Sequence, residues 1–211
     1  MTPVPSSPSD AVWRVRLLAI SIGLAALAFG QRSGEVVPDT KLDLTLNPVG
    51  FLERALHLWD PMGFFGQVQN QAYGYLFPVG PIHAGLQALG LAPWIVQRLW
   101  WTLVLLTAFW GVWRLTGAMV TQAPWPRVLA ALLYALSPRM VSEVAITSVE
   151  VWPMAVAPWV LLPLVDRTPR SWPQRILWSA AAVGVIGGVN AVATGAALVL
   201  PALWFATRRP L

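Results

Sequence analysis

Asp39, Lys41 and Asp43 place two carboxylates and an ammonium group within five residues of one another. Transfer of a sugar to an acceptor hydroxyl needs a carboxylate that takes up the hydroxyl proton. It also needs cations that hold a phosphate leaving group. Asp39 could be that base, and Lys41, Arg32 or Arg139 could hold the phosphate. The alternative is structural, because the same residues could form a solvated surface pair and a helix cap.

A second polar stretch, between residues 59 and 75, has the composition of a carbohydrate-binding surface. Amide groups can hydrogen-bond to sugar hydroxyls, and the faces of Trp and Tyr rings can stack on sugar rings. The residues that would do so are Trp59, Gln69, Asn70, Tyr73 and Tyr75. An ordered loop with side-chain caps would have the same composition, so both interpretations stay open.

Glu150 and Asn190 are two further polar residues among apolar neighbours. Glu150 could be a second acid/base group or an ion-pair partner of Arg139. Asn190 follows two glycines, so it could contact a substrate or cap a helix.

Few residues in this chain could bind a metal ion. There is no Cys, and His57 and His83 are the only imidazoles. This excludes disulfides, thiolate metal sites and Cys nucleophiles. A zinc site with two His would need carboxylate ligands as well. No metal site is predicted and no cofactor is indicated with certainty, while the need for a divalent cation stays open.

The composition is that of a membrane protein. Hydrophobic residues make up 56% of the chain and charged residues 11%, and the mean hydropathy is +0.60. The 13 Trp and 19 Pro residues suit membrane helices with interfacial aromatic belts and broken ends. The net charge is +5, but the basic residues lie at the ends of apolar runs and form no nucleic-acid-binding face. The predicted partner is therefore the lipid bilayer, and no nucleic acid.

One large loop, residues 31–93, separates the first two apolar runs and holds five of the nine acidic residues. Ionised carboxylates in hydrocarbon cost several kcal/mol, so this loop must lie outside the lipid. Within it, the apolar i, i+3, i+4 pattern of Pro48–Trp59 predicts an amphipathic helix at the lipid interface. The Gly, Gln, Asn and Tyr content of Gly63–Gly80 argues against a membrane span.

The apolar runs predict an all-α integral membrane fold with about five or six membrane segments. Residues 1–11 are rich in Pro and Ser and are predicted to be disordered, and the membrane domain covers residues 12–207. The first span contains Leu17–Phe29. The same pattern fits a signal peptide cleaved after Ala26–Ala28, but the hydrophobic segments that follow favour a retained span.

Later elements follow from the remaining apolar runs and from proline positions. Gln97 and Arg98 lie near the outer end of the second span, where we expect Arg98 to snorkel to the interface. The expected elements are the second span at about 94–119, a third segment at 128–136 that is too short to cross, an irregular or re-entrant segment at 139–150, and a fourth span at 151–165 interrupted by Pro153, Pro158 and Pro163.

The last apolar run, residues 176–207, is about 48 Å long as one helix at about 1.5 Å per residue. A hydrocarbon core is only about 30 Å thick, so we expect a break at Gly187–Asn190 and a hairpin. With the N-terminus inside, this topology places nine basic residues inside and five outside. A single final span would give seven on each side, which is the less favourable distribution.

This topology brings the long loop, segment 139–150 and the break at 187–190 to the same outer face. Irregular backbone at membrane depth occurs mainly where it is buried in protein or lines a cavity. The three segments are therefore expected to form a site.

Six sequence stretches carry a resemblance to a known family: PDTKLDL (38–44), FLERALHLWDP (51–61), GQVQNQAYGYLFPVGP (66–81), VQRLWW (96–101), SVEVWPMAVAPWVLLPLV (148–165) and GGVNAVATGAAL (187–198). Together they resemble the N-terminal part of actinobacterial alpha-(1→3)-arabinofuranosyltransferases. The resemblance covers most of residues 12–205, and QNQAYGYLFP is its most specific piece.

The resemblance implies a GT-C-type membrane glycosyltransferase with its active site on the external face of the cytoplasmic membrane. Its donor would be decaprenyl-phosphoryl-arabinose, and its acceptor would be the arabinan of arabinogalactan or lipoarabinomannan. An acidic residue early in the first external loop is the usual candidate base in that superfamily. Here it corresponds to Asp39, with Asp43 as the alternative. Family members are far longer, so the chain is expected to be a fragment.

Two other function classes are compatible with such a sequence. A lipid-sugar transporter or flippase fragment would also have broken helices around a polar cavity. Transporters usually place coupling charges near the bilayer midplane, whereas here the acids lie in an external loop. A non-catalytic membrane scaffold for cell-wall enzymes is the third interpretation.

Overall fold

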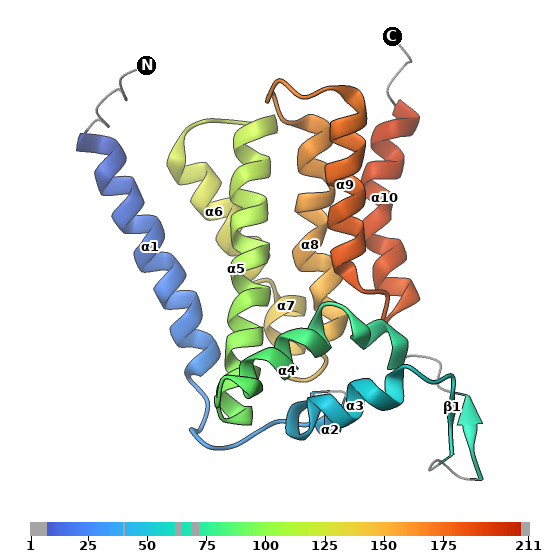
Figure 1. The fold of residues 1–211 in the computed structure, drawn as a ribbon. Helices are drawn as coiled ribbons and strands as arrows, with labels where there is room; N and C mark the ends of the chain where they lie inside the picture. The colour runs from blue at the N-terminus through green and yellow to red at the C-terminus, as the bar shows by residue number, and fades with distance from the viewer. Residues whose placement is uncertain (1–7, 40, 62–64, 69–71, 208–211) are drawn as a thin grey trace.

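The computed structural model describes residues 8–39, 41–61, 65–68 and 72–207, and most of them are helical. The long helices α1, α5, α8, α9 and α10 run side by side as a bundle, with the shorter α6 against α5 (Figure 1). The remaining elements cross one end of this bundle. The bounds are α1 Pro8–Phe29, α2 Leu42–Leu46, α3 Pro48–Ala55, β1 Trp59–Asp60, β2 Gln67–Val68, the 3-10 helix η1 Ala72–Leu76, α4 Val79–Ala88, α5 Pro93–Met119, α6 Pro124–Ala135, α7 Pro138–Glu143, α8 Ser148–Val165, α9 Trp172–Ile186 and α10 Ala191–Thr207.

Among the residues that the structure describes, three helices are long and apolar enough to cross a bilayer: Ala11–Phe29 of α1, all of α5 and all of α8. Helix α10 is apolar but has 17 residues, α9 has 15 and α6 has 12. A perpendicular span needs roughly 20 residues. The predicted all-helical membrane fold is confirmed, as is the long second span. The expected five or six membrane segments stay a prediction.

Helix α1 begins earlier than the sequence indicated. It starts at Pro8, so the disorder predicted for residues 1–11 is wrong for residues 8–11, while residues 1–7 lie outside the described part. Proline is well tolerated in the first helical turn, where its missing N–H would have no partner within the helix. Leu24 and Ala28 are buried where α1 packs on α5.

Helix α8 continues without a break through its three prolines, so the predicted interruption of this span is wrong. A proline leaves the carbonyl four residues earlier without its helical N–H donor. For Pro158 that carbonyl belongs to Met154, and the Tyr134 hydroxyl of α6 donates to it at 2.8 Å. At this position α6 thus supplies the hydrogen-bond donor that the proline lacks.

The last apolar run forms the predicted hairpin, with α9 and α10 joined through Gly187 and Gly188. Their φ angles are 88° and 78°, in the region that favours glycine. A Cβ at Gly187 would lie 2.2 Å from the Phe77 carbonyl oxygen, so this turn also packs tightly against the long loop.

The amphipathic helix predicted to reach Trp59 ends at Ala55, and Trp59 lies in β1. Part of its apolar face is covered by protein, although Val49 is exposed, and its position at the lipid interface stays a prediction. Phe51 and Ala55 are buried, and the Phe51 ring packs edge-on against Tyr75 with 5.4 Å between ring centroids. The loop folds back over α3, so protein covers that part of the face, while Leu56 beyond the helix is exposed.

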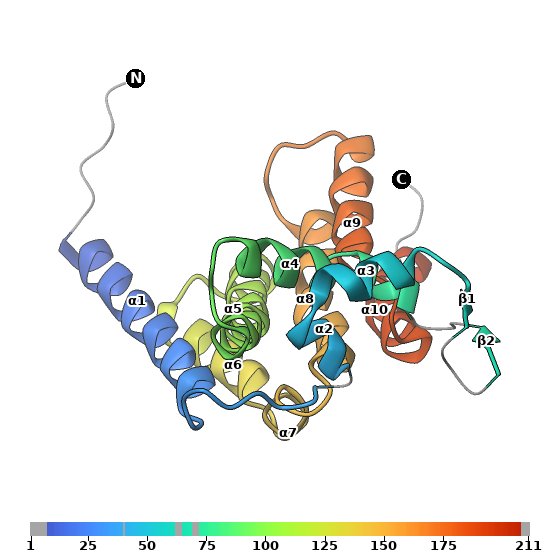
Figure 2. The same ribbon diagram turned by 60° about the horizontal axis from the view of Figure 1, so that its bottom comes forward.

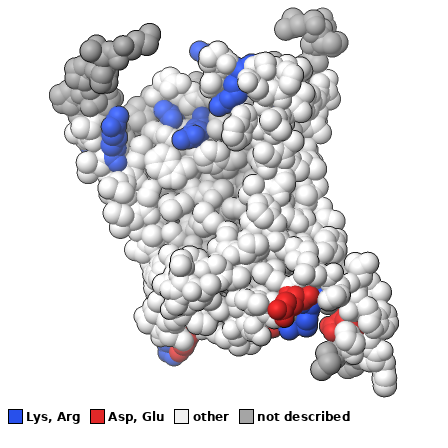
Figure 3. Space-filling view, in the orientation of Figure 1, with Lys and Arg blue, Asp and Glu red and all other residues white. Residues whose placement is uncertain are grey.

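The bundle has two ends of different charge. The described residues of segments 30–92, 136–147 and 187–190 form what we call the acidic end, drawn downward in Figure 1, and Figure 3 shows the Asp and Glu side chains of the visible face there. The opposite, basic end includes residues 120–123 and 166–171. Figure 2 shows α2, α3 and α4 crossing the acidic end, with the β1–β2 hairpin projecting from it.

Candidate active site at the acidic end

Side chains at the start of α5 hold the extended segment that leads out of α1. Gln97 accepts a hydrogen bond from the Val37 N–H at 3.0 Å and donates to the Val37 carbonyl at 2.7 Å. Arg98 donates to the Glu35 carbonyl at 3.2 Å. Its guanidinium carbon lies 4.1 Å from the centroid of the Trp101 ring. These contacts fall on Glu35 and Val37, two positions apart. In an extended chain alternate residues face the same side, so one side of the segment is held against α5.

Arg98 is only 1% exposed, so the expectation that it snorkels to the interface is wrong. The segment after α1 covers the start of α5, so the Arg98 guanidinium contacts the Glu35 carbonyl of that segment and the Trp101 ring of α5 instead of water. Gln97 adds its side-chain oxygen, which accepts from Arg98 at 3.2 Å. An ionisable side chain buried within a membrane helix commonly marks a functional site.

Asp39 is the end point of this segment and is held by donors from two helices. Its Oδ1 accepts from the Ser148 N–H at 2.7 Å, and its Oδ2 accepts from the Ser148 hydroxyl at 2.6 Å and the Trp101 indole at 3.1 Å. Ser148 is the first residue of α8, where N–H groups have no partner within the helix. The preceding Thr147 side chain does not cap the helix. Asp39 therefore caps α8 from another part of the chain, where its charge also complements the helix dipole.

A second layer surrounds this carboxylate. The Trp100 indole donates to the Ser148 hydroxyl at 2.8 Å, and the His83 ring lies 6.3 Å from the Trp100 ring, centroid to centroid. Burial lowers the pKa of His83 below its ordinary value of 6.5. The hydrogen bond between its Nδ1 and the Val79 carbonyl and the negative charge of Asp39 act in the opposite direction. A neutral imidazole is thus favoured beside the Asp39 network.

Glu150, one turn into α8, joins segment 139–150 to the α9–α10 turn. Its Oε2 lies 3.4 Å from Arg139, and its Oε1 accepts from the Asn190 amide at 3.3 Å. Arg139 also pairs with Glu143 at 3.7 Å. The Asn190 side-chain oxygen accepts from the Ala193 N–H at 3.0 Å, so Asn190 caps α10, which is one of its two predicted roles, while contact with a substrate stays a prediction.

The long loop closes this assembly through η1. A Cβ at Gly74 would lie 2.6 Å from the Cα of Val189 and 2.7 Å from its nitrogen, so the two backbones are in direct contact. The long loop, segment 139–150 and the break at 187–190 therefore lie together at the acidic end.

None of the other charged candidates hydrogen-bonds to the Asp39 carboxylate among the described residues. Asp43 forms an exposed ion pair with Arg54 at 2.7 Å. Arg32 pairs with Glu35 at 3.6 Å, and both side chains are largely exposed. Among the described residues, the Lys41 ammonium has no ion-pair partner, and this residue is half-buried two positions after Asp39.

The predicted carbohydrate surface is only partly formed. Tyr73 is exposed on η1, and Trp59 is exposed on the projecting hairpin, where its ring covers Gly66. Tyr75 is completely buried against Phe51, so its ring belongs to the core and offers no free face to a sugar. Gln69 and Asn70 lie outside the described residues.

No group of three or more His, Asp or Glu side chains converges as a metal site would within the part of the chain that the structure describes. His57 is exposed and His83 is buried, so the two imidazoles differ in environment. The need for a divalent cation stays open.

The family model for the N-terminal GT-C domain of alpha-(1→3)-arabinofuranosyltransferase matches residues 23–211. The chain belongs to this family. It is 45% identical over 189 residues to the alpha-(1→3)-arabinofuranosyltransferase of Mycobacterium tuberculosis, covering 88% of this chain and 14% of that protein. The enzyme of the same name from Mycolicibacterium smegmatis is 44% identical over 193 residues, with 90% and 14% covered.

Solved structures agree with this membership. A cryo-EM structure of a mutant of arabinofuranosyltransferase AftD from mycobacteria superposes with a TM-score of 0.87 at 43% identity, covering 93% of this chain and 16% of that one. A cryo-EM structure of AftD without a stated mutation gives 0.84 at 44% identity, covering 93% and 15%. The GT-C domain described here thus spans about a seventh of the curated relatives' length.

Sequence reasoning missed the residues that hold Asp39 in this GT-C domain. Trp100 and Trp101 were assigned to the apolar second span, Ser148 to the irregular segment 139–150, and Gln97 to the outer end of the second span. A signal was present, because Gln97 and Arg98 stand side by side within an otherwise apolar run. Polar residues in a span need partners inside the protein, but the sequence did not reveal which ones.

Proposed function

We propose that this domain is the membrane part of an arabinofuranosyltransferase in which Asp39 activates the acceptor hydroxyl. The observation that carries the proposal is the carboxylate itself, oriented by Ser148 and Trp101 at the end of a segment clamped by α5. Its Oδ1 accepts one hydrogen bond, so this oxygen retains a lone pair for a hydroxyl proton. Asp43 is a weaker candidate because it is already engaged with exposed Arg54.

The reaction would move arabinofuranose from decaprenyl-phosphoryl-arabinose to an arabinan hydroxyl. The acceptor oxygen bonds to the anomeric carbon while the bond from that carbon to the phosphate oxygen breaks. The hydroxyl proton passes to Asp39, and the polyprenyl phosphate leaves with the electron pair of the broken bond.

Lys41 is the cation that fits the leaving phosphate best, because it follows Asp39 closely and has no ion-pair partner among the described residues. Arg139 already faces two carboxylates, so it fits a positioning role for Glu150 and Asn190 better. Exposed Tyr73 and Trp59 remain candidates for contact with the acceptor arabinan.

The acidic end would face the outside of the cytoplasmic membrane. Cytoplasmic ends of membrane helices carry an excess of Lys and Arg. The predicted topology counts nine basic residues on the inner side and five on the outer side, where the segments of the acidic end lie. The donor and the arabinan would therefore meet on the external face.

Asp39→Asn in the full-length enzyme tests this proposal. Asn caps helices about as well as Asp, so the variant keeps an acceptor for the Ser148 N–H but loses the base. The Asn amide nitrogen cannot accept from the Ser148 hydroxyl or the Trp101 indole, so we expect a lower unfolding temperature. Per folded protein, we expect transfer from decaprenyl-phosphoryl-arabinose to be reduced about 10²- to 10⁴-fold. Asp43→Asn is the matched control and should transfer arabinose almost normally. Normal transfer by Asp39→Asn would leave Asp39 with a structural role only.

A further inference from the structure

A cavity of about 860 Å³ opens between α5, α8 and α9, away from Asp39. Along α8 its lining runs from Trp152 to Pro163, about 16 Å at about 1.5 Å per residue. That length matches about half of a 30 Å hydrocarbon core. The cavity therefore has the depth of one leaflet and starts at the basic end.

The mouth of the cavity is strongly basic. Arg114, Arg127, Arg167 and Arg170 line it, with Asp166 as the one acidic lining residue. Figure 3 shows basic side chains gathered at the basic end, which is the upper part of the visible face.

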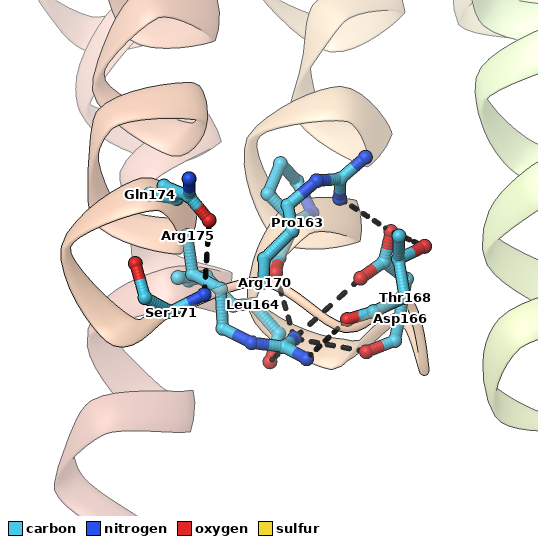
Figure 4. A network of polar contacts seen from close by, with 8 residues as sticks. All are labelled: Pro163, Leu164, Asp166, Thr168, Arg170, Ser171, Gln174 and Arg175. Carbon is cyan, nitrogen blue, oxygen red and sulfur yellow. Dashed lines mark hydrogen bonds and ion pairs between the residues drawn. The ribbon is translucent and has the colours of Figure 1, made fainter.

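The single carboxylate at the mouth is already neutralised. Asp166 pairs with Arg170 at 2.7 Å and with Arg175 at 3.5 Å, and Figure 4 shows both guanidinium groups converging on it. Within the described part of the chain, Arg114, Arg127 and Arg167 have no carboxylate partner. The Arg127 Nε donates to the Trp113 carbonyl at 3.1 Å and its guanidinium lies over the Trp113 ring, while that of Arg114 lies over the Trp159 ring. The positive charges of all three side chains can therefore attract an anion from outside this network.

Below the mouth, the walls of the cavity are mainly apolar. Two of the three lining tryptophans have their indole N–H satisfied within the protein, Trp152 donating to the Val185 carbonyl at 2.8 Å and Trp159 to the Thr107 carbonyl at 2.9 Å. The other lining residues at this depth include Val156, Leu162, Ala181 and Ala182. Such walls favour an apolar chain over water or a polar ligand.

Tryptophans near the basic end indicate that the mouth lies at headgroup level. Trp13 packs edge-on against Trp125 at 5.0 Å between ring centroids, and Trp172 contacts Trp204 at 5.7 Å. Trp residues concentrate where hydrocarbon meets water.

We propose that this groove binds an anionic phospholipid from the leaflet at the basic end. The phosphate lies among Arg114, Arg127 and Arg167, and an acyl chain runs down α8 between α5 and α9. The site is separate from the Asp39 site and does not depend on the proposed transfer reaction.

Native mass spectrometry of the full-length protein released from nanodiscs tests the proposal. The nanodiscs contain phosphatidylglycerol and phosphatidylcholine in equal amounts, and the quantity measured is the retained phosphatidylglycerol. We expect wild-type protein to retain phosphatidylglycerol selectively, even with excess inorganic phosphate present. Arg114→Gln with Arg167→Gln should lower retention about 30-fold, from about fivefold for each basic residue.

Two matched controls separate this site from general attraction to acidic lipid. Arg14→Gln with Arg16→Gln removes the same charge at the same end but outside the groove, and should retain the lipid. Ala181→Trp fills the groove and should abolish retention, whereas Ala180→Trp on the adjacent exposed position should not.

Several results would overturn the proposal. Equal loss in the two arginine pairs would mean nonspecific charge attraction. Displacement by inorganic phosphate would mean a free-anion site. Failure of the wild-type protein to retain phosphatidylglycerol would mean that another protein segment or an acidic peptide occupies the groove.

Discussion

Replacing Ser148 by alanine would remove the hydroxyl that lies between Asp39 and Trp100. That hydroxyl donates to Asp39 Oδ2 at 2.6 Å and accepts from the Trp100 indole at 2.8 Å. Trp100 is completely buried, so its N–H cannot turn to water after the change. The substitution therefore removes one charge-assisted hydrogen bond and leaves one buried donor without a partner.

The size of the effect follows from these two losses. A hydrogen bond to a charged group contributes about 1.5–3 kcal/mol, and an unpaired buried donor costs about 1–3 kcal/mol. Asp39 keeps the Ser148 N–H and Trp101 as donors. We therefore expect Ser148→Ala to lower the free energy of unfolding by about 2.5–6 kcal/mol, the sum of the two losses. Ser179→Ala is the matched control, because its hydroxyl donates at 2.8 Å to the neutral Val160 carbonyl and should cost about 1 kcal/mol.

The free energy of unfolding can be measured in mixed micelles from tryptophan fluorescence. Trp100→Phe removes the indole donor, so adding Ser148→Ala in that background leaves no unpaired N–H. The double variant should be less destabilised than the sum of the single variants by about 1–3 kcal/mol. Equal losses for the Ser148 and Ser179 variants, or additivity within about 0.5 kcal/mol, would refute this reasoning.

Three further predictions test other parts of the structure. Gln97→Leu leaves both backbone groups of Val37 without their partner, so the free energy of unfolding should fall by about 2–3 kcal/mol; a loss below about 0.5 kcal/mol would contradict the clamp. Burial lowers the folded-state pKa of His83, so the unfolded chain binds its proton more readily, and stability should decrease as pH falls below about 6.5, by at most about 1.4 kcal/mol per pH unit. His83→Gln should reduce this slope in unfolding midpoints measured from about pH 7.5 to about pH 5.5, and an unchanged slope would exclude His83 as the cause. Gly187→Ala should destabilise more than Gly188→Ala, because both have positive φ but only Gly187 would place a Cβ against backbone, 2.2 Å from a carbonyl oxygen; equal melting temperatures would argue against that close contact.

Parts of the fold that depend on local sequence were predicted well. The second span, the break before α7 and the final hairpin follow from apolar length, proline and paired glycines. Errors arose where a distant partner changes the outcome. Pro158 does not interrupt α8, because Tyr134 supplies a donor to Met154. Arg98 does not reach the interface, because the segment after α1 covers it.

The candidate site shows the same division. Asp39 stood out from the sequence because an ionised carboxylate beside a membrane span must lie outside lipid. Glu150 was correctly paired with Arg139 as one of its two interpretations. Tyr75 was misplaced, because residue type alone does not reveal whether a ring faces a sugar or the core.

The sequence by itself determined the membrane class, the segregation of charge to two ends and the presence of acids beyond the first span, because hydropathy and charge are properties of short stretches. Only the tertiary structure decided which groups surround Asp39. Ser148 is 109 residues away and Trp101 is 62 residues away. The N–H at the start of α8 needs some acceptor, but only the packing of α1, α5 and α8 makes that acceptor Asp39.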